Sequence, residues 1–135
     1  MASVFTKIVK GEIPAYKVAE DDRFLAFLDI NPLTKGHTLV IPKEEIDYIF
    51  DLPEELYKDL WLFARRVASA IEKVVKCERI GIAVVGLEVP HAHIHLIPIN
   101  SIADMNFAKP RVKMTNEEFK ELAEQINAAY KDLYE

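Results

Sequence analysis

Three of the four histidines, His91, His93 and His95, lie at alternate positions of the sequence. Side chains alternate between the two faces of a β-strand, so in an extended segment these three imidazoles would share one face. Imidazole has an unperturbed pKa of about 6.5, and one of its nitrogens can attack while the other is held by a hydrogen bond. The spacing therefore predicts a cluster for nucleophilic or proton-transfer chemistry, in which the middle residue, His93, reacts.

A metal centre is the main alternative interpretation of the histidine cluster, because neutral imidazole is a common ligand of transition metals. Histidines that occur by chance on a surface strand would explain one such residue better than three in alternation. Cys77 is the only cysteine, so the chain can form neither an internal disulfide nor a cysteine-based zinc cage. His37 stands alone at the start of another apolar run, where a histidine is commonly structural.

The residues around the cluster favour β-strands. The run 80–85 is mainly apolar and ends at Gly86. The run 89–99 follows it and has Pro90 and Pro98 near its two ends. We expect two adjacent strands joined by a tight connection. One face of the second strand would enter the core through three apolar residues that alternate with the histidines, namely Ala92, Ile94 and Leu96.

Two further strands are predicted nearer the start of the chain. Residues 24–29 form a short apolar run, and residues 37–41 form another that ends at Pro42. Between them lie Asn31-Pro32 and Lys35-Gly36, which are typical of turns because proline fixes φ and glycine accepts a positive φ. We expect the two strands to be antiparallel.

Two helices are predicted from apolar residues at three- and four-residue steps. The first is long and carries Leu56, Leu60, Phe63, Val67, Ile71 and Val74. The second begins at Thr115 and Glu118, which have the spacing of a capping box, and continues with Phe119, Leu122, Ile126 and Tyr130. Between residues 101 and 114 no period survives, and Lys109-Pro110-Arg111 indicates an extended loop that could cross a neighbouring surface.

The composition limits the classes of protein and partner. With 135 residues, half of them apolar, residues 1–135 are expected to form a single domain. The net charge of −5 and the absence of a basic stripe argue against nucleic acid as a partner. No apolar run reaches membrane-spanning length, and a single cysteine suits a reducing compartment, so we expect a cytoplasmic protein that does not bind membranes.

With these residues in hand, the chain resembles the histidine triad (HIT) family, specifically its Hint-like branch. The family signature is His-φ-His-φ-His-φ-φ, where φ is an apolar residue, and residues 91–97 match it. The segments 5–15, 24–32 and 36–43 are also similar to the N-terminal half of Hint-type proteins. The resemblance covers roughly the first hundred residues in the family's order.

The resemblance implies an α+β fold: an antiparallel sheet of about five strands, with the long helix on one face and a C-terminal helix. It also implies a symmetric homodimer in which two protomers join their sheets. The expected ligand is a purine nucleotide or a nucleotide conjugate.

The implied activity is hydrolysis or nucleotidyl transfer at the α-phosphorus of a phosphoramidate or a dinucleoside polyphosphate. His93 would be the nucleophile and would form a nucleotidyl-histidine, with no metal or other cofactor. By the same resemblance His91 and His95 would flank and orient it, with His95 also facing the phosphate, and His37 would support the cluster from the neighbouring strand. Two alternatives stay open, a nucleotide-binding regulator with little catalysis and a histidine-based metal-binding protein.

The resemblance further implies the nucleotide-binding residues. Asp29 would accept the ribose hydroxyls, although a carboxylate beside Asn31-Pro32 could instead cap a turn. The purine pocket would be lined by Val4, Phe5, Ile8, Phe27 and Ile30. Plain core packing is an equal alternative for the last two of these.

The first departure from the family concerns zinc. Many members carry a zinc site made by an N-terminal Cys-x-x-Cys pair and a later histidine, but this chain has Ser3, Thr6 and Glu45 at those positions. Hydroxyl groups are poor ligands for zinc, so we predict that this structural metal is absent and that packing stabilises the corner instead.

The second departure lies before the histidine cluster, where family members usually have a longer loop and a Gly-Gln pair. Here Leu87 replaces the glutamine, which predicts weaker catalysis or a different substrate because one hydrogen bond to the phosphate or leaving group is lost. Glu88 could act as a proton carrier instead. Lys7, Lys43, Arg111 and Lys113 could contribute positive potential, although scattered surface cations are usually just solvated. Trp61 is most simply interpreted as helix packing.

Overall fold

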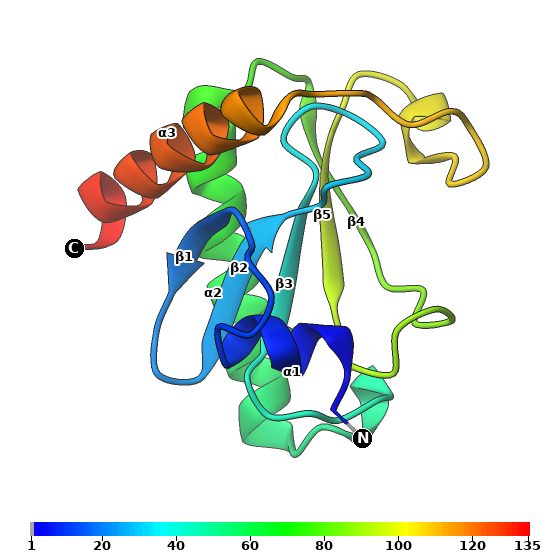
Figure 1. Cartoon of the computed structure of the whole chain (residues 1–135), viewed down its shortest axis with the longest axis vertical. Coiled ribbons are helices and arrows are strands. Elements are labelled where there is room, and N and C mark those ends of the chain that lie inside the picture. Colours follow the sequence, from blue (N-terminus) through cyan, green and yellow to red (C-terminus); the bar gives the residue numbers. More distant parts are fainter. Residues whose placement is uncertain (1) are drawn as a thin grey trace.

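A five-stranded antiparallel sheet organises the chain in the computed structural model, which describes residues 2–135 (Figure 1). The strand order is β1-β2-β3-β5-β4, so that β4 and β1 are the two edges. The strands are β1 (Lys17–Glu20), β2 (Phe24–Leu28), β3 (Thr38–Pro42), β4 (Arg79–Ala83) and β5 (Ile94–Ile99). The expected α+β fold with about five antiparallel strands is confirmed.

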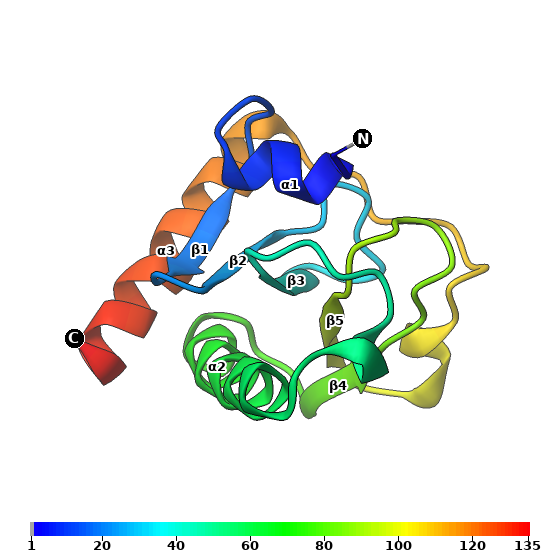
Figure 2. The same ribbon diagram turned by 90° about the horizontal axis from the view of Figure 1, so that it is seen from below.

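The helices cover both faces of this sheet. The long helix α2 (Glu54–Val74) and the C-terminal helix α3 (Asn116–Tyr134) pack against one face, and the short helix α1 (Val4–Val9) lies on the other (Figure 2). The capping box of Thr115 and Glu118 opens α3 as predicted. No helix within the described residues is both long and apolar enough to cross a bilayer.

The strand register divides the apolar residues into two cores. Ala26, Val40 and Ile94 belong to the core beneath α2 and α3, whereas Phe27 and Leu39 belong to a smaller core beneath α1. Leu39 pairs with His95 in the ladder, so His95 lies on the α1 face of the sheet. The sheet therefore presents its histidine-bearing face to α1, away from the larger core.

The turn before β3 depends on Gly36. Its φ is +95°, a conformation that residues with a Cβ rarely adopt. A Cβ at this position would also lie 3.0 Å from a side-chain carbon of Val75. Glycine thus lets the chain turn sharply and direct His37 inward at the start of β3.

Several short elements were not predicted from the sequence. They are α1, the edge strand β1 and two 3₁₀ helices at Ile49–Asp51 and Ile102–Met105. The second 3₁₀ helix interrupts the expected loop of residues 101–114. Each of these elements is too short to show a clear hydrophobic period.

Candidate active site

The histidine cluster begins before its strand. The expected strand over residues 89–99 is wrong at its start, because β5 begins only at Ile94. The amide of His91 donates to the carbonyl of Val89 at 2.8 Å, and the amide of Ala92 donates to Ile46 at 2.7 Å, so neither joins the β3 ladder. The connection from β4 is consequently longer than the tight link we expected. The predicted alternation survives, since Ala92 and Ile94 are buried in the helix-side core.

The ring of His93 is held in one tautomer. Its Nδ1 lies 2.7 Å from the carbonyl oxygen of His91, and a carbonyl can only accept, so Nδ1 carries the proton. The lone pair is therefore on Nε2. The edge of the Phe5 ring packs against this imidazole at a centroid distance of 5.0 Å. Although only 6 % of His93 is exposed, it lines two cavities.

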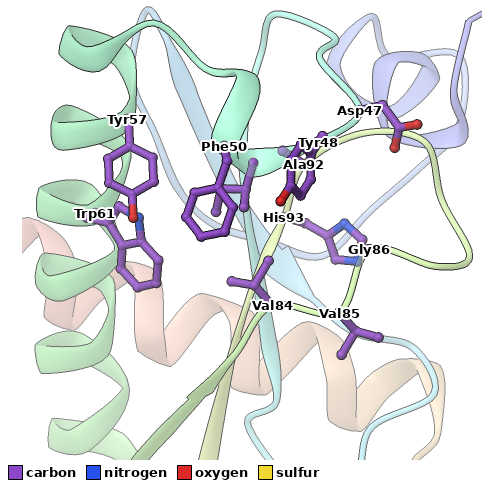
Figure 3. A pocket seen from close by; sticks show the side chains of 11 residues that line it. Asp47, Tyr48, Phe50, Tyr57, Trp61, Val84, Val85, Gly86, Ala92 and His93 are labelled. Carbon is purple, nitrogen blue, oxygen red and sulfur yellow. The ribbon is translucent and has the colours of Figure 1, made fainter.

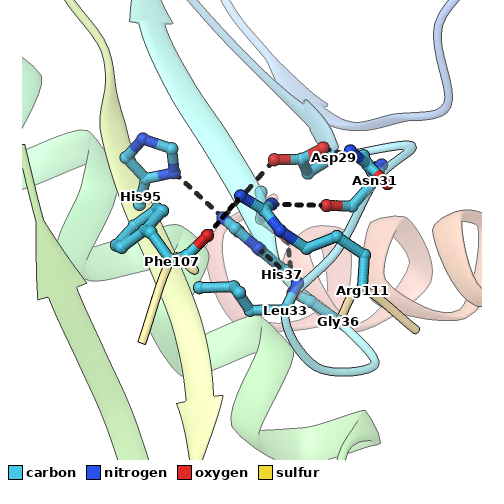
Figure 4. Close-up of polar contacts among 9 residues, drawn as sticks. Asp29, Asn31, Leu33, Gly36, His37, His95, Phe107 and Arg111 are labelled. Atoms are coloured by element: carbon cyan, nitrogen blue, oxygen red, sulfur yellow. Dashed lines mark hydrogen bonds and ion pairs between the residues drawn. The ribbon is translucent and has the colours of Figure 1, made fainter. Parts of the chain in front are cut away.

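His95 and His37 form a buried pair whose tautomers are set by the backbone (Figure 4). The amide of Leu33 donates to His37 Nδ1 at 3.0 Å, which leaves the ring proton on His37 Nε2. That nitrogen lies 2.9 Å from His95 Nδ1 and donates to it, so His95 carries its own proton on Nε2. His95 can therefore donate a hydrogen bond to a ligand in the cavity that it lines.

Burial keeps this pair uncharged. It lowers the pKa of His37 from 6.5 to about 3, with a smaller contribution from His95. The pKa of His95 falls from 6.5 to about 4, again chiefly through burial and less through His93. At neutral pH both rings are neutral, so they offer hydrogen bonds rather than positive charge.

His91 differs from the other two members of the cluster. Its Nε2 donates to the carbonyl of Pro42 at 2.8 Å, and its Nδ1 accepts from the hydroxyl of Ser3 at 2.8 Å. The side chain is 0 % exposed and lines neither cavity. The expectation that all three imidazoles face one accessible hollow is wrong for His91, because both of its nitrogens are engaged inside the protein.

A network of hydrogen bonds occupies the corner around His91. Glu45 Oε1 accepts from the Ser3 amide at 2.7 Å and from the Thr6 hydroxyl at 2.6 Å. These bonds, that of the Ser3 amide first, hold the pKa of Glu45 down at about 2. We predicted that packing would stabilise this corner, but the three side chains do so mainly through hydrogen bonds to one another and to His91.

The larger cavity, of about 440 Å³, lies between α1 and the sheet beside His93 and His95. The structure brings together at its wall all six predicted nucleotide-binding residues, which are Val4, Phe5, Ile8, Phe27, Asp29 and Ile30. Phe27 both packs in the core and lines the cavity, through a ring that meets Phe5 edge-on at 5.5 Å. The packing and lining interpretations of Phe27 are thus compatible.

Asp29 serves the turn and also faces the cavity. Its Oδ1 accepts from the amide of Asn31 at 2.8 Å, which is the turn cap considered above. Its Oδ2 lies 3.6 Å from His37 Nε2. Burial is the main influence on this carboxyl and raises its pKa. Asp29 therefore retains an oxygen near the histidine pair and the cavity wall.

Sequence reasoning missed one cavity residue, Phe107, and named Arg111 only as one of four cations that could contribute positive potential. The Phe107 ring meets His95 edge-on at 5.0 Å, and Arg111 lies on the cavity wall close to Asp29 (Figure 4). Both come from the segment without periodicity, and no pattern in the sequence indicates which of its residues fold back onto β3. Leu87 and Glu88 also line the cavity, whereas Lys43 pairs with Glu20 at 2.9 Å elsewhere.

A second cavity of about 300 Å³ lies on the other side of His93 (Figure 3). Its wall is formed by the 3₁₀ helix Ile49–Asp51 and the residues before it, by α2 and by the chain after β4. Its aromatic side chains come from Tyr48, Phe50, Tyr57 and Trp61. Trp61 packs against the helix-side core as expected, but it also lines this cavity.

The donor set nearest to a metal site is Asp29, His37 and His95, whose ligand atoms lie within 4.8 Å of one another. The tautomers do not suit a metal there. The Leu33 amide keeps the proton of neutral His37 on Nε2, the nitrogen that faces the other two groups, whereas a metal needs an unprotonated nitrogen. The predicted metal alternative, a centre made by the three clustered histidines, is also disfavoured because His91 has no free nitrogen.

Comparisons with known proteins agree with this architecture. The chain is 38% identical to the adenosine 5'-monophosphoramidase of Schizosaccharomyces pombe, over 97% of this chain and 100% of the yeast protein. A HIT-like protein of Bartonella henselae involved in cell-cycle regulation superposes with a TM-score of 0.81 at 30% identity, covering 94% of this chain and 95% of that chain.

A zinc-bound histidine triad protein of Mycobacterium smegmatis is equally similar in structure, with a TM-score of 0.81, 32% identity, and coverage of 98% of this chain and 96% of that chain. The family model of the HIT domain matches residues 10–102. The chain therefore belongs to the histidine triad family.

Proposed function

We propose that the protein hydrolyses the bond between the α-phosphorus of a purine nucleotide and a leaving amine, with His93 as the nucleophile. The observation that carries this proposal is the tautomer of His93, whose Nδ1 is held by the His91 carbonyl so that the lone pair of Nε2 is available beside the cavity. The yeast relative named adenosine 5'-monophosphoramidase supports this class of reaction.

In the first step His93 Nε2 attacks phosphorus while the bond from phosphorus to the amine breaks, and the departing amine takes a proton from water. The positive charge that develops on the His93 ring is stabilised by the hydrogen bond from Nδ1 to the His91 carbonyl. His95 Nε2 donates to a non-bridging phosphoryl oxygen, where negative charge concentrates. In the second step water attacks phosphorus, the phosphorus–Nε2 bond breaks, and a nucleoside 5'-monophosphate is released.

The other wall residues would hold the nucleoside. Phe5, Phe27 and the aliphatic side chains around them offer an apolar slot for a purine base, and Asp29 would accept hydrogen bonds from the ribose hydroxyls. His37 would act through His95 by fixing its tautomer, and His91 through His93 by placing its carbonyl.

The test is His93→Ala assayed with an adenosine 5'-phosphoramidate. We expect turnover to fall by at least about a thousandfold, because the lone pair that forms the covalent bond is removed, while adenosine monophosphate still binds. Intact-mass analysis of the parent protein after a rapid quench should show one nucleotidyl group on His93. Hydrolysis by the variant at the parental rate would disprove the assignment.

One observation favours a second function, a nucleotide-binding regulator with weak catalysis. Leu87, which stands where family members usually have glutamine, lines the cavity with 88 % of its surface exposed and cannot donate a hydrogen bond. A regulator would bind adenosine monophosphate without a burst of amine release.

We further propose that residues 1–135 act as one domain and pair as a homodimer through the β4 edge. The two cores lie on opposite faces of the same sheet, which argues for one folding unit. Among the residues that the structure describes, no strand pairs with β4 on its outer side, and Ile82 on this strand is 53 % exposed. Phe50, which is 67 % exposed, lines the second cavity together with Val84 and Val85, the two residues that follow β4.

A further inference from the structure

The segment 106–112 folds back over the histidine pair and forms one rim of the larger cavity. Its end is fixed to the turn before β3, because the amide of Val112 donates to the Pro32 carbonyl at 2.9 Å. Near its start, the Phe107 ring meets His95 at 5.0 Å and His37 at 6.4 Å. The segment is thus positioned at both ends, and the residues it carries have defined places at the cavity.

Arg111 is held by this segment in a fixed orientation. One guanidinium nitrogen donates to the Asn31 carbonyl at 2.7 Å and another donates to the Phe107 carbonyl at 3.2 Å (Figure 4). A guanidinium has five N–H donors, so several remain for a ligand after these two bonds. Because both acceptors are neutral backbone groups, they orient the guanidinium without neutralising its charge.

Within residues 2–135, Arg111 is the only lysine or arginine that lines the larger cavity, and it has no carboxylate within ion-pair distance. The cavity wall also carries the carboxylates of Asp29 and Glu88, which repel an anion. The rings of His37 and His95 are neutral and so do not offset the negative charge of these two carboxylates. The wall therefore depends on Arg111 for positive charge.

The field of Arg111 reaches the inner wall of the cavity. Its charge contributes to the lowered pKa of His37 and of His95, after burial and the neighbouring histidine in each case. A phosphate that contacts His95 would lie within the same field. An anion would be attracted by this interaction at a place where the two carboxylates alone would repel it.

We propose that Arg111 is the specificity-determining residue that recognises the negative charge of the nucleotide's phosphate. This inference rests on the proposed function, because it assumes that the cavity beside His93 holds a nucleotide. It assigns the affinity for the phosphate to a side chain outside the histidine cluster, and it predicts that uncharged nucleosides bind without help from Arg111.

The test compares adenosine monophosphate with adenosine, which differ by the phosphate alone, using isothermal titration calorimetry on the full chain. Arg111→Gln removes the charge but keeps an N–H donor for the Asn31 carbonyl. We expect this variant to lose roughly 10- to 100-fold in affinity for the monophosphate and less than about threefold for adenosine. Arg111→Lys, which keeps the charge but not the fork of donors, should lose less for the monophosphate than Arg111→Gln.

Lys109→Gln is the matched control. Lys109 belongs to the same segment and its loss removes the same charge, but it pairs with Asp104 at 3.4 Å and does not line the cavity. We expect this variant to bind both ligands as the parent does. If Arg111→Gln weakened both ligands equally, or if Lys109→Gln reproduced its effect, the inference would be overturned. Thermal unfolding identifies a misfolded variant, and Arg111→Lys then carries the comparison.

The two proposals fail in different ways. If His93→Ala keeps its turnover, the proposed mechanism fails, yet the difference between adenosine monophosphate and adenosine still tests Arg111. If the parent protein turns over the phosphoramidate but Arg111→Gln binds the monophosphate as tightly as the parent, the role of Arg111 fails alone. A parent protein that binds neither ligand would overturn both.

Discussion

Backbone groups set the chemistry of individual histidines in this protein. A carbonyl fixes the proton of His93 on Nδ1, and an amide fixes the proton of His37 on Nε2, from which the tautomer of His95 follows. His93 and His37 are each assigned by a backbone group that can only accept or only donate, and His95 is assigned by the His37 ring once its tautomer is fixed. Two histidines only two positions apart therefore differ: Nε2 of His93 carries a lone pair, whereas Nε2 of His95 carries a proton that it can donate.

The buried histidines should make stability depend on pH. The pKa of His37 is lowered from 6.5 to about 3 and that of His95 from 6.5 to about 4, so as the pH falls below 6.5 the unfolded chain takes up protons that the folded protein does not. The contribution of these two neutral rings to the free energy of unfolding is fully present above pH 6.5 and is lost as the pH falls below it. Between pH 7 and pH 5 we expect the free energy of unfolding to fall by roughly 2 kcal/mol for each of these rings.

Urea unfolding at the two pH values measures this loss, and His37→Gln should show a shallower dependence because one titrating ring is gone. The pKa of His91 is also lowered by burial and adds to the trend in the same direction. Asp29, whose pKa is raised by burial, acts in the opposite direction. A free energy of unfolding that stays constant from pH 7 to pH 5 would contradict the prediction.

The sequence was a good guide to residues whose position follows from alternation. It correctly placed Ala92 in the core and His95 on the opposite face. It could not show that His91 is sealed inside, because that depends on Ser3 and Pro42, which are distant in sequence. It named Arg111 among four cations that could contribute positive potential but could not choose between them, because the bond from Arg111 to the Asn31 carbonyl spans 80 positions.

At the scale of elements, helix α1 closes the larger cavity and is attached to the sheet by the network of Ser3, Thr6, Glu45 and His91. The helix carries Phe5 and Ile8 into the cavity wall, and the Ser3 side chain caps its first turn through the Thr6 amide at 3.0 Å. Weakening these hydrogen bonds should therefore shift the residues of α1 that line the cavity more than it shifts the imidazole rings.

Thr6→Val tests this attachment, because it removes the hydroxyl that donates to Glu45 at 2.6 Å and keeps the shape of the side chain. We expect the free energy of unfolding to fall by about 1 kcal/mol, and KM for a phosphoramidate to rise several-fold with a smaller change in kcat. Lys7→Ala, in the same helix but exposed, is the control and should change neither value. An unchanged KM in Thr6→Val would show that the network does not position α1.

Metal removal provides a separate prediction for the same network. Glu45 Oε1 accepts from the Ser3 amide and the Thr6 hydroxyl, and the Ser3 hydroxyl accepts from the Thr6 amide and donates to His91, so these groups are held together without an ion. Dialysis against a chelator should leave the midpoint of thermal unfolding within about 1 °C of the untreated protein. A drop of several degrees that added zinc reverses would mean that a structural metal binds after all.

The elements that the sequence predicted are those with a hydrophobic pattern over many residues or with clear capping and turn residues at their ends. Helix α2 follows its three- and four-residue pattern closely, and α3 begins at its capping box. Strand β1 has only four residues, with buried positions at its centre instead of alternation, so its sequence lacks a strand signal. The late start of β5 at Ile94 depends on bonds to Val89 and Ile46, which hydrophobic pattern does not encode.

At the scale of the whole molecule, the two edges of the sheet differ. Edge strand β1 is covered by α3, with which it makes extensive contacts. Edge strand β4 lies at the opposite side of the molecule from the C-terminus, and no element of the described residues 2–135 pairs with its outer side (Figure 1). An uncovered edge with apolar neighbours invites pairing with another strand, and a second copy of the same edge would satisfy it symmetrically.

Ile82→Glu tests the proposed dimer, because it places two like charges next to each other at a symmetric contact. We expect the parent protein to elute as a dimer in size-exclusion chromatography with light scattering. In the variant we expect the dissociation constant of the dimer to rise by roughly 100-fold or more. Ile82 is 53 % exposed in the single chain, so the folded protomer should tolerate the change, and circular dichroism checks this.

Leu133→Glu is the control for the dimer, since Leu133 is similarly exposed but lies in α3, on the side of the sheet far from β4. It should leave the mass unchanged. His93 lines the second cavity together with Val84, Val85 and the aromatic residues of α2, so a partner seated along β4 would lie next to the ring that we propose as the nucleophile. Dissociation by Ile82→Glu should therefore also lower kcat, and a monomeric variant with full activity would show that the edge contact and the chemistry are independent.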